Sequence, residues 1–436
     1  MKPSRYNVII PYNDNFSLVF NGITGSFLVL DKNALNLLKK AQNSKKISFE
    51  YKDAENDFQK MKNFGIIVDE DFDEKKYIKV LNRREVFSTD NLITWIAPTF
   101  NCNLNCVYCF EGKKRARMSP ETQSKTLEFI KNKIKKSSNY ALMWFGGEPL
   151  LEKDIICNMT RKIHSYCTDY ECSFYAGIIT NGYLLDKKTA ENLVKNDINY
   201  LQTTLDGPKE VHDKKRMQKN GKGTYDVILQ NIVDVTDIIP KIVVRVNIDK
   251  ENVGKIDELL DDLIDAGLRN KIGIFYMPVW SDTPACKDMS ESCVSDMDFL
   301  KIEQDLLKKT LEKGFGMSKY PLPSIGGCGL LHENSFFIDP DGDLYSCVKT
   351  VGFEKEKIGD IYNPLKMNKN RIKWLSWDPF SFEKCNDCKF LPICMGGCPY
   401  EFHNKELREP VCNNWKNTLE DVLKLYFQSI YSEKIK

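Results

Sequence analysis

Six strand-like segments alternate with amphipathic segments between residues 92 and 280, and this alternation restricts the possible folds most strongly. The six segments are rich in β-branched and aromatic residues: LITWIAPTF, ALMWFGG, CSFYAGIIT, YLQTTLD, KIVVRVNI and KIGIFYM. Stretches with helical periodicity lie between them, for example ETQSKTLEFIKNKIKK and KIDELLDDLIDAG. Because repeated strand–helix units build parallel sheets, residues 92–280 are predicted to form an α/β domain, a partial (β/α)6 barrel of the TIM type.

Ten of the 15 cysteines fall into two groups with regular spacing. The first group has the pattern C-x3-C-x2-C and directly follows the first predicted strand: Cys102, Cys106 and Cys109. The second group lies in the last quarter of the chain: Cys328, Cys347, Cys385, Cys388, Cys394, Cys398 and Cys412. In parallel βα arrays the chemistry lies at the carboxyl ends of the strands, which is where the first group is placed.

Metal binding explains these cysteines better than disulfides do. The chain has 436 residues and its first residues, MKPSRYNVII, do not form a signal peptide. A reducing, cytoplasmic location is therefore expected, and clustered thiols there bind metals rather than pair. A structural zinc site uses only four ligands and explains at most one of the groups. The two groups indicate several iron–sulfur clusters, and a set of three thiolates leaves one iron of a four-iron cluster open.

The charge balance gives no sign of a nucleic-acid or membrane partner. The 63 basic and 61 acidic residues leave a net charge of +2, which creates no field for an anionic polymer or lipid. No apolar run reaches the length of about 18 residues that a membrane span needs. The local basic run of Lys113, Lys114, Arg115 and Arg117 is interpreted as a solvated loop. The length predicts two or three domains.

Three further parts flank the predicted barrel. Residues 1–85 contain the strand-like runs YNVIIPY, SLVF and GSFLVL, a helix that follows Asp31 and another near residues 54–64, which predict a winged-helix-like module. Residues 281–325 are expected to be a helical bridge that carries Cys286 and Cys293. Residues 326–436 are expected to be a cysteine-rich domain with a final helix. In its segment FFIDPDGDLYSC a hairpin turn is predicted at Asp341–Gly342, with Cys347 on the returning strand.

The loop from Cys102 to Phe110 resembles the signature of the radical S-adenosylmethionine (SAM) superfamily. Further matching motifs are Phe145-Gly-Gly-Glu-Pro149 after the second strand, Thr180-Asn-Gly182 after the third, and Thr203-Thr-Leu-Asp-Gly-Pro208 with His212, Asp213 and Arg216 in the fourth unit. The resemblance implies that Cys102, Cys106 and Cys109 hold a 4Fe–4S cluster whose open iron binds SAM. Reductive cleavage of SAM then yields a 5′-deoxyadenosyl radical that abstracts hydrogen.

The same resemblance implies the residues that contact the cofactor: Tyr108, Gly146, Gly147, Glu148, Thr180, Asn181, Thr204, Arg216, Arg245 and Asn247. Glycines without side chains would let the backbone approach the methionyl amine, and Glu148 would offer it a carboxylate. Thr204 and Arg216 would bind the methionyl carboxylate, Arg245 or Asn247 would reach the ribose or the carboxylate, and Tyr108 would form a wall near the adenine. Each polar residue, taken alone, fits a strand-end cap or a turn equally well.

The second cysteine group resembles the SPASM domain of peptide and protein maturases. The resemblance implies that Cys385, Cys388, Cys394 and Cys412 hold one fully ligated auxiliary cluster, and that Cys328, Cys347 and Cys398 hold another. Three 4Fe–4S clusters are therefore expected in all. Five other cysteines are interpreted as small buried hydrophobes: Cys157, Cys167, Cys172, Cys286 and Cys293.

Two departures separate the chain from anaerobic sulfatase maturases. Those enzymes carry an eighth cysteine soon after the first SPASM cysteine, but residues 329–346 contain none. They also place a catalytic aspartate directly after the second SPASM cysteine, where this chain has Val348. The missing aspartate removes the proton acceptor of that oxidation. Unless one of the five other cysteines reaches it, the first auxiliary cluster keeps an open iron that could bind a substrate thiolate.

These features predict an enzyme that modifies a ribosomally made precursor peptide. The first 85 residues resemble PqqD-like recognition elements, which bind a leader peptide as an additional strand; a purely structural cap is the alternative. The favoured reaction is an intramolecular thioether crosslink. Carbon–carbon crosslinking, a sulfatase-type maturation and a non-catalytic iron–sulfur electron carrier are the alternatives. An electron donor such as flavodoxin or ferredoxin is an expected partner.

Overall fold

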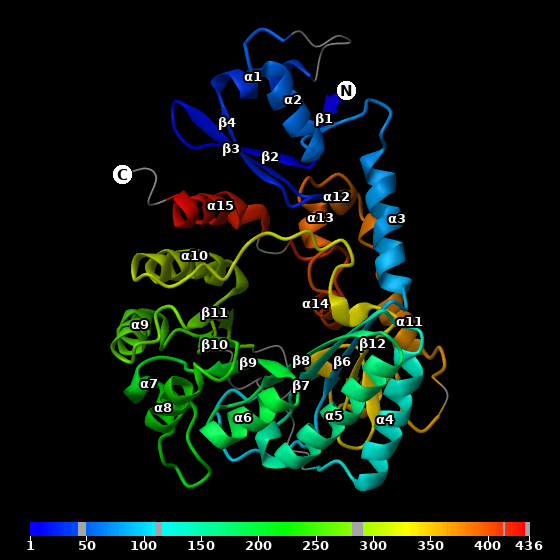
Figure 1. The fold of residues 1–436 in the computed structure, drawn as a ribbon, viewed down its shortest axis with the longest axis vertical. Helices are drawn as coiled ribbons and strands as arrows, with labels where there is room; N and C mark the ends of the chain where they lie inside the picture. The colour runs from blue at the N-terminus through cyan, green and yellow to red at the C-terminus, as the bar shows by residue number, and fades with distance from the viewer. Residues whose placement is uncertain (42–48, 110–115, 281–290, 364, 413–414, 432–436) are drawn as a thin grey trace. The chain divides into compact units, whose positions relative to one another are not determined.

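The computed structural model describes residues 1–41, 49–109, 116–280, 291–363, 365–412 and 415–431 (Figure 1). Cys286, Phe110 and most of the predicted basic run (Lys113, Lys114 and Arg115) lie outside these residues. The chain forms two compact units. The larger unit contains residues 88–318 and 333–375, and the smaller one contains residues 1–87, 319–332 and 376–436.

The larger unit is built on a mostly parallel sheet with the strand order β11-β10-β9-β8-β7-β6-β12-β13-β14. Its six consecutive parallel strands are β6 (Asn91–Ile96), β7 (Asn139–Trp144), β8 (Ser173–Ile179), β9 (Ile198–Thr204), β10 (Lys241–Ile248) and β11 (Ile272–Pro278). All six overlap the predicted segments. The fold class, a mixed α/β array of the partial-barrel type, is confirmed.

Helices follow each of the six parallel strands. They are α4 (Pro120–Ile134), α5 (Lys153–Asp169), α6 (Lys187–Lys195), α7 (Lys209–Lys215), α8 (Tyr225–Val235), α9 (Ile256–Asp265) and α10 (Asp296–Glu312). Polar side chains fix several of their starts: Ser119 accepts a hydrogen bond from Thr122 N at 3.0 Å, and Asp186 accepts one from Thr189 N at 2.7 Å. Apolar residues every three or four positions then turn one face of each helix to the sheet.

The hairpin near residue 340 extends the parallel sheet. Strand β12 (Ser335–Ile338) pairs in parallel with β6 and antiparallel with β13 (Asp343–Tyr345), which pairs with β14 (Gly359–Asp360). The turn at Asp341–Gly342 is confirmed: Gly342 has a φ of +87°, and the Asp339 carboxylate accepts from Asp341 N and Asp343 N, both at 2.9 Å. The predicted position of Cys347 on the returning strand is wrong. Because only two residue pairs join β12 and β13, the strand ends at Tyr345, and Cys347 precedes the short 3-10 helix η5 (Val348–Thr350).

The smaller unit contains a three-stranded antiparallel sheet of β2 (Asn7–Pro11), β3 (Phe16–Asn21) and β4 (Phe27–Asp31). Helix α1 (Lys32–Lys40) begins directly after Asp31, whose carboxylate accepts from Ala34 N at 2.8 Å. Helix α2 (Ala54–Asn63) follows, and β5 (Ile67–Val68) pairs with β1 (Lys2–Pro3). These elements match the predicted runs. Helix α3 (Glu74–Phe87) extends beyond them.

Strand β3 is buried on both faces, because neighbouring residues of a strand point in opposite directions. Val19 packs into a core formed by α1 and α2. Leu18 and Phe20 pack into a second core with Leu419, Leu423 and Phe427 of α15 (Trp415–Tyr431). Residues 1–87 therefore share a hydrophobic core with the end of the chain, whereas the sequence suggested a separate module over 1–85 and another over 326–436.

Candidate active site

A cavity lies at the carboxyl ends of the parallel strands in the larger unit, and its volume, which includes space open to solvent, is about 870 Å³. All six βα units contribute to its lining: Cys102, Cys106, Tyr108, Cys109, Gly146, Gly147, Ile179, Thr180, Asn181, Gln202, Thr204, Arg216, Arg245, Asn247, Pro278, Val279 and Trp280. The structure thus brings together the three cysteines and every predicted cofactor contact except Glu148. Parallel strands place the loops that follow them at one edge of the sheet. Residues as far apart in the chain as Cys102 and Trp280 therefore line the same cavity.

Two segments hold the three-cysteine loop in place. The backbone of the loop donates hydrogen bonds to the end of α7 and the residues after it, from Asn105 N to Met217 O at 2.8 Å and from Val107 N to Lys215 O at 3.0 Å. Around Cys102 Sγ lie two nitrogen donors, Leu104 N at 3.4 Å and Asn181 Nδ2 at 3.7 Å. Such donors stabilise a thiolate, the form of cysteine that binds metals. The loop is therefore positioned to present its sulfur atoms to the cavity.

Gly146 and Gly147 let the backbone before the cysteine loop pack closely against them. A Cβ atom on Gly147 would lie 2.4 Å from Asn101 O, and one on Gly146 would lie 2.4 Å from Thr99 O. Gly146 also has a φ of +125°, which side-chain-bearing residues rarely adopt. Gly147 N donates to Thr99 O at 3.1 Å. The two glycines therefore allow the backbone of residues 99–101 to pack closely against them. This role adds to the predicted one, in which they let the backbone approach the bound cofactor.

Replacing Gly147 with alanine is expected to lower the free energy of unfolding by about 1–3 kcal/mol, because the added methyl group meets fixed backbone atoms. Thermal unfolding followed by circular dichroism measures the effect. Gly254→Ala is the matched control, since no atom lies within 4 Å of its added Cβ, and it should change stability by less than about 0.5 kcal/mol. Equal melting temperatures for the two variants would contradict this interpretation of the loop.

Glu148 has a different environment from the one expected. Its side chain is fully buried, and its carboxylate accepts hydrogen bonds from Thr180 Oγ1 at 2.7 Å, Asn181 N at 2.7 Å and Leu150 N at 2.9 Å. Burial raises the pKa of Glu148 although these donors oppose the shift. Glu148 does not line the cavity. In the structure it joins the ends of β7 and β8, so it positions Thr180 and Asn181 instead of reaching into the cavity itself.

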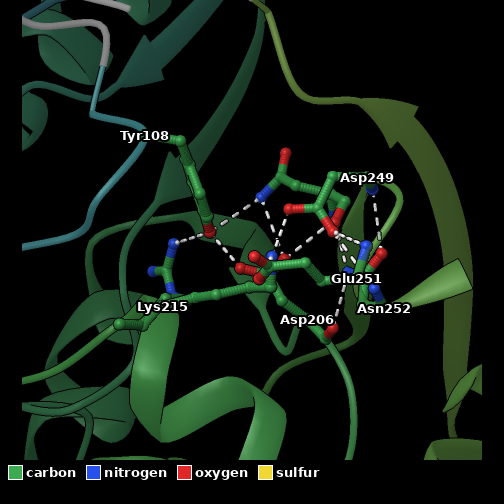
Figure 2. A network of polar contacts seen from close by, with 8 residues as sticks. Tyr108, Asp206, Lys215, Asp249, Glu251 and Asn252 are labelled. Atoms are coloured by element: carbon green, nitrogen blue, oxygen red, sulfur yellow. Dashed lines mark hydrogen bonds and ion pairs between the residues drawn. The ribbon is translucent and has the colours of Figure 1, made fainter. Parts of the chain in front are cut away.

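Asp206 lies in a network of polar contacts that includes the cavity-lining residue Tyr108 (Figure 2). This fully buried carboxylate accepts hydrogen bonds from the Tyr108 hydroxyl, from Asn247 N at 2.8 Å and from Asn247 Nδ2 at 3.1 Å. Arg216 Nη1 and Asn247 Nδ2 also donate to the Tyr108 oxygen, at 2.9 and 3.2 Å. Burial raises the pKa of Tyr108 well above its usual value, so the phenol stays neutral. Asp206 thus fixes two cavity-lining side chains from different strand ends.

Further hydrogen bonds and a buried ion pair hold Asp206 and its neighbours in place. Asn252 Nδ2 donates to Asp206 O and to Asn247 O, both at 2.7 Å. Next to it, buried Lys215 forms an ion pair with the buried carboxylate of Asp249, and its Nζ lies 3.2 Å from Glu251 (Figure 2). Buried charges are tolerated when they are paired in this way. The pair joins the last residue of α7, which precedes Arg216, to the residue that follows β10.

Comparison with known proteins identifies the larger unit. The model of the radical SAM superfamily matches residues 96–283. The chain contains a radical SAM domain. The matched range includes the three-cysteine loop and every residue that lines the cavity. The predicted superfamily is confirmed, and the chain is a radical SAM enzyme.

Two curated relatives illustrate the range of similarity. The cysteine-type anaerobic sulfatase-maturating enzyme of Clostridium novyi is 26% identical over 367 residues, which span 77% of this chain and 92% of the relative. The Fe-coproporphyrin III synthase of Methanosarcina barkeri is 28% identical over 177 residues, but this chain spans only 42% of its length. These levels of identity do not carry the activity of either relative over to this chain.

Two solved structures share the fold. The sulfatase-maturating enzyme anSMEcpe with bound AdoMet and the Kp18Cys peptide has a TM-score of 0.60 at 18% identity and covers 79% of this chain and 100% of its own. Streptococcus suis SuiB bound to its precursor peptide SuiA has a TM-score of 0.55 at 16% identity and covers 95% of this chain and 98% of its own. The SuiB fold therefore extends over nearly the whole chain.

The residues of the radical SAM cavity fit the cofactors of the superfamily, a 4Fe–4S cluster and SAM. Three cysteines line the cavity, as a cluster with one open iron requires. Arg216 is 7% exposed, and its Nε atom is buried without a hydrogen-bond partner in the described part of the chain. An unpartnered cationic donor of this kind suits a carboxylate, and the methionyl group of SAM carries one.

A second cavity lies in the smaller unit. Its lining includes Cys385, Cys388, Cys394 and Cys412, the four residues predicted to ligate one auxiliary cluster. Burial, and then the neighbouring thiols, raises the pKa of Cys385 to about 11. The electrostatic interaction with the neighbouring Cys412 side chain raises the pKa of Lys384 above its usual value. All four cysteines thus line one cavity, although no three or more His, Cys, Asp or Glu side chains of the described residues are spaced to hold a single metal ion.

The predictions about the five other cysteines have mixed outcomes. Cys167, Cys172 and Cys293 are buried, as expected of small hydrophobes, while Cys157 is only half-buried. Cys286 lies outside the described residues. No role was predicted for Asp206, although it is part of a matching motif. Gln202, Trp280 and the pair Lys215–Asp249 were not predicted either. These residues have no sequence signature because their roles depend on contacts between distant segments.

Across the described ranges, no helix is both long enough and apolar enough to cross a membrane.

Proposed function

We propose that this enzyme abstracts a hydrogen atom from a precursor peptide and thereby installs an intramolecular crosslink. The observation that carries the proposal is the three-cysteine cavity, found in a chain that shares the fold of SuiB over 95% of its length. The SuiB structure contains a precursor peptide, and the anSMEcpe structure contains a peptide as well. A peptide substrate is therefore the class that the similarities support best.

The residues of the cavity have complementary roles in this reaction. When bound, the cluster and SAM supply the 5′-deoxyadenosyl radical. Cys102, Cys106 and Cys109 hold the cluster, and Arg216 binds the methionyl carboxylate with Thr204 beside it. Tyr108, which Asp206 fixes, forms a wall for the nucleoside. Glu148 keeps the Thr180–Asn181 segment in position. We retain Gly146, Gly147, Thr180, Asn181 and Asn247 as further cofactor contacts.

A thioether remains the favoured crosslink. It forms between a peptide cysteine and a carbon centre when one hydrogen atom, one proton and one electron leave. An auxiliary cluster held by Cys328, Cys347 and Cys398 would offer an open iron for the peptide thiolate and would accept the electron. Together with the set around Cys385, this gives three clusters in the holoenzyme. Carbon–carbon crosslinking is the close alternative, since it needs no thiolate ligand.

Sulfatase-type maturation is a second candidate function. The similarity to the Clostridium novyi enzyme over 92% of its length favours it. Val348 opposes it, because this residue follows Cys347 where sulfatase maturases carry an aspartate and a valine cannot accept a proton.

Co-expression of the enzyme with each short peptide encoded beside its gene tests the function. We expect one peptide to lose the mass of two hydrogen atoms, and a trypsin fragment that contains cysteine to become resistant to alkylation if the product is a thioether. Oxidation of a cysteine or serine in a co-expressed sulfatase, with every peptide unchanged, would instead show sulfatase-type maturation.

The three-stranded sheet of the smaller unit is the proposed leader-binding element. Its outer strands β2 and β4 have free edges within the described sheet, and each exposes an apolar side chain: Ile9 and Val29 are both 41% exposed. A leader that adds a strand to one edge would form main-chain hydrogen bonds and contact such a side chain. Deleting residues 1–87 would not test this, because it would also uncover the core around Leu419 and Leu423.

The leader would add to either β2, which carries Ile9, or β4, which carries Val29. We expect a glutamate at the position on the strand that binds the leader (Ile9→Glu or Val29→Glu) to weaken precursor-peptide binding about tenfold or more in the full-length enzyme. Fluorescence anisotropy of a labelled precursor measures the affinity. Val80→Glu on α3 is the matched control, because Val80 is 64% exposed but lies on no strand. Unchanged affinity in both sheet variants, or an equal loss in Val80→Glu, would contradict a leader site on this sheet.

A further inference from the structure

His212 belongs to a matching motif of the fourth βα unit, and the proposed function gives it no role. The residue lies in helix α7, and its side chain is fully buried. Its ring lies 5.6 Å from the ring of Tyr225, the first residue of α8. Burial, and then the charge of Arg216, lowers the pKa of His212 well below its usual value. The imidazole is therefore neutral, and only one of its two nitrogens carries a proton.

The contacts of His212 determine which nitrogen carries that proton. Asp206 N donates a hydrogen bond to His212 Nδ1 at 3.3 Å. Because a backbone N–H can only donate, Nδ1 is the acceptor and the proton is on Nε2. His212 Nε2 lies 3.1 Å from Thr224 Oγ1 and donates to it, and the Thr224 hydroxyl donates to Arg216 O at 2.6 Å. The three hydrogen bonds thus form one directed series that begins at Asp206 and ends at Arg216.

The two ends of this series hold different parts of the radical SAM cavity. Asp206 accepts a hydrogen bond from the cavity-lining residue Tyr108. At the other end, the backbone of Arg216 is held twice: its N donates to His212 O at 2.8 Å, and its O accepts from Thr224. The side chain of Arg216 starts from this backbone, and its Nη1 donates to Tyr108. A shift of the backbone would therefore move the guanidinium within the cavity.

We propose that His212 is a positioning residue for SAM, which acts through Thr224 to hold the backbone of Arg216 where the guanidinium binds the methionyl carboxylate. This inference rests on the proposed role of Arg216. His212 does not line the cavity, so it acts only through its neighbours. The proposal predicts a selective defect. Loss of the series should weaken recognition of the carboxylate, whereas loss of a purely structural histidine would weaken every contact with the cofactor alike.

Two ligands measure this selectivity: SAM and its decarboxylated form, S-adenosyl-3-methylthiopropylamine, which keeps the nucleoside and the amine. Anaerobic equilibrium dialysis on the cluster-reconstituted enzyme without peptide gives both affinities, and iron analysis checks that the clusters are retained. We expect His212→Phe to bind SAM about tenfold more weakly and the decarboxylated form within about twofold of the unaltered enzyme, because only the hydrogen bonds to the charged carboxylate are lost. Thr224→Val should show the same defect, and the double variant should be no worse than either single variant.

Two conservative variants separate the ends of the series. In His212→Gln the amide can donate at the position of Nε2, so the contact with Thr224 remains and most of the preference for SAM should be retained. In His212→Asn the shorter side chain can accept from Asp206 N at the position of Nδ1 but cannot reach Thr224. His212→Asn should therefore lose the preference as His212→Phe does.

Thr310→Val is the matched control for Thr224→Val. Thr310 is a buried threonine of α10 whose hydroxyl lies 2.7 Å from the Tyr276 hydroxyl and donates to Leu306 O at 2.7 Å. This variant should bind both ligands like the unaltered enzyme. Arg216→Gln is the reference variant, because it removes the cation itself and should lose the preference for SAM.

An equal loss of affinity for both ligands in His212→Phe, or unchanged binding of both in His212→Phe and Thr224→Val, would overturn the positioning role. If one of these variants does not fold, the other decides. A lost preference in Arg216→Gln alone refutes only this inference, whereas a full preference in Arg216→Gln refutes the proposed role of Arg216 as well. The measurement contains no peptide, so a failure to modify any precursor would refute the proposed function and leave the positioning role standing.

Discussion

The triple variant Cys102→Ala, Cys106→Ala, Cys109→Ala is expected to lose about four of about twelve irons per chain and all reductive cleavage of SAM. The three side chains line one cavity, and no other cysteine lines it among the described residues, so no thiolate is placed to replace them. The four cysteines around the second cavity belong to the smaller unit and are unchanged by the substitution. Iron and sulfide analysis measures the clusters, and chromatography of 5′-deoxyadenosine measures the cleavage.

The control for this triple variant is Cys157→Ala, which removes a half-buried thiol of α5 that lines neither cavity. It should keep about twelve irons and the full cleavage rate. About four irons in the unaltered protein would show that the second cysteine group binds no iron–sulfur cluster. Cleavage of SAM by the triple variant would contradict the assignment of the cavity itself.

The second large effect is expected for Asp206→Asn, which should lower kcat/KM for SAM cleavage about 100-fold. The substitution keeps the shape of the side chain, but an amide cannot accept all the hydrogen bonds that Tyr108 and Asn247 donate to the carboxylate. Tyr108 and Asn247 line the cavity, so both would shift relative to the bound cofactor. Asp206 does not itself line the cavity, so it acts as a positioning residue through Tyr108 and Asn247.

Steady-state rates at a series of SAM concentrations test this role, because loss of position should raise KM and lower kcat together. Tyr108→Phe removes one of the hydrogen bonds to Asp206 and should cost about tenfold, less than Asp206→Asn. Asp226→Asn, at an exposed carboxylate of α8, is the matched control and should leave both constants unchanged. A normal KM and kcat in Asp206→Asn would show that the network in Figure 2 is only structural.

The sequence predicted the features that depend on local patterns. Strand and helix periodicity located all six parallel strands, because the hydrophobic pattern of each buried strand is contained within its own residues. The position of the cysteine loop after β6 then followed from the general rule for βα arrays. The same rule predicts that residues at the ends of different strands lie together, and Gly146, Thr180, Thr204 and Asn247 do line one cavity.

Features that depend on contacts between distant segments could not be read from the sequence. Glu148 was expected to contact the cofactor. In the structure its carboxylate accepts hydrogen bonds from Thr180 and Asn181, which directly follow the neighbouring strand β8. The roles of Asp206 and Trp280 arise where the ends of several strands meet. The shared core of β3 and α15 could not be predicted for the same reason, because the residues of α15 that cover the second buried face of β3 come about 400 positions later in the chain.

Transfer of deuterium from the peptide to the cofactor tests the central claim most directly. The holoenzyme is incubated with dithionite, SAM and the co-encoded precursor peptide, labelled with deuterium at the side chains of its core. Direct abstraction at the cavity predicts 5′-deoxyadenosine that carries one deuterium and appears together with the modified peptide. Modified peptide accompanied only by unlabelled 5′-deoxyadenosine, when every core position has been labelled in turn, would contradict the account.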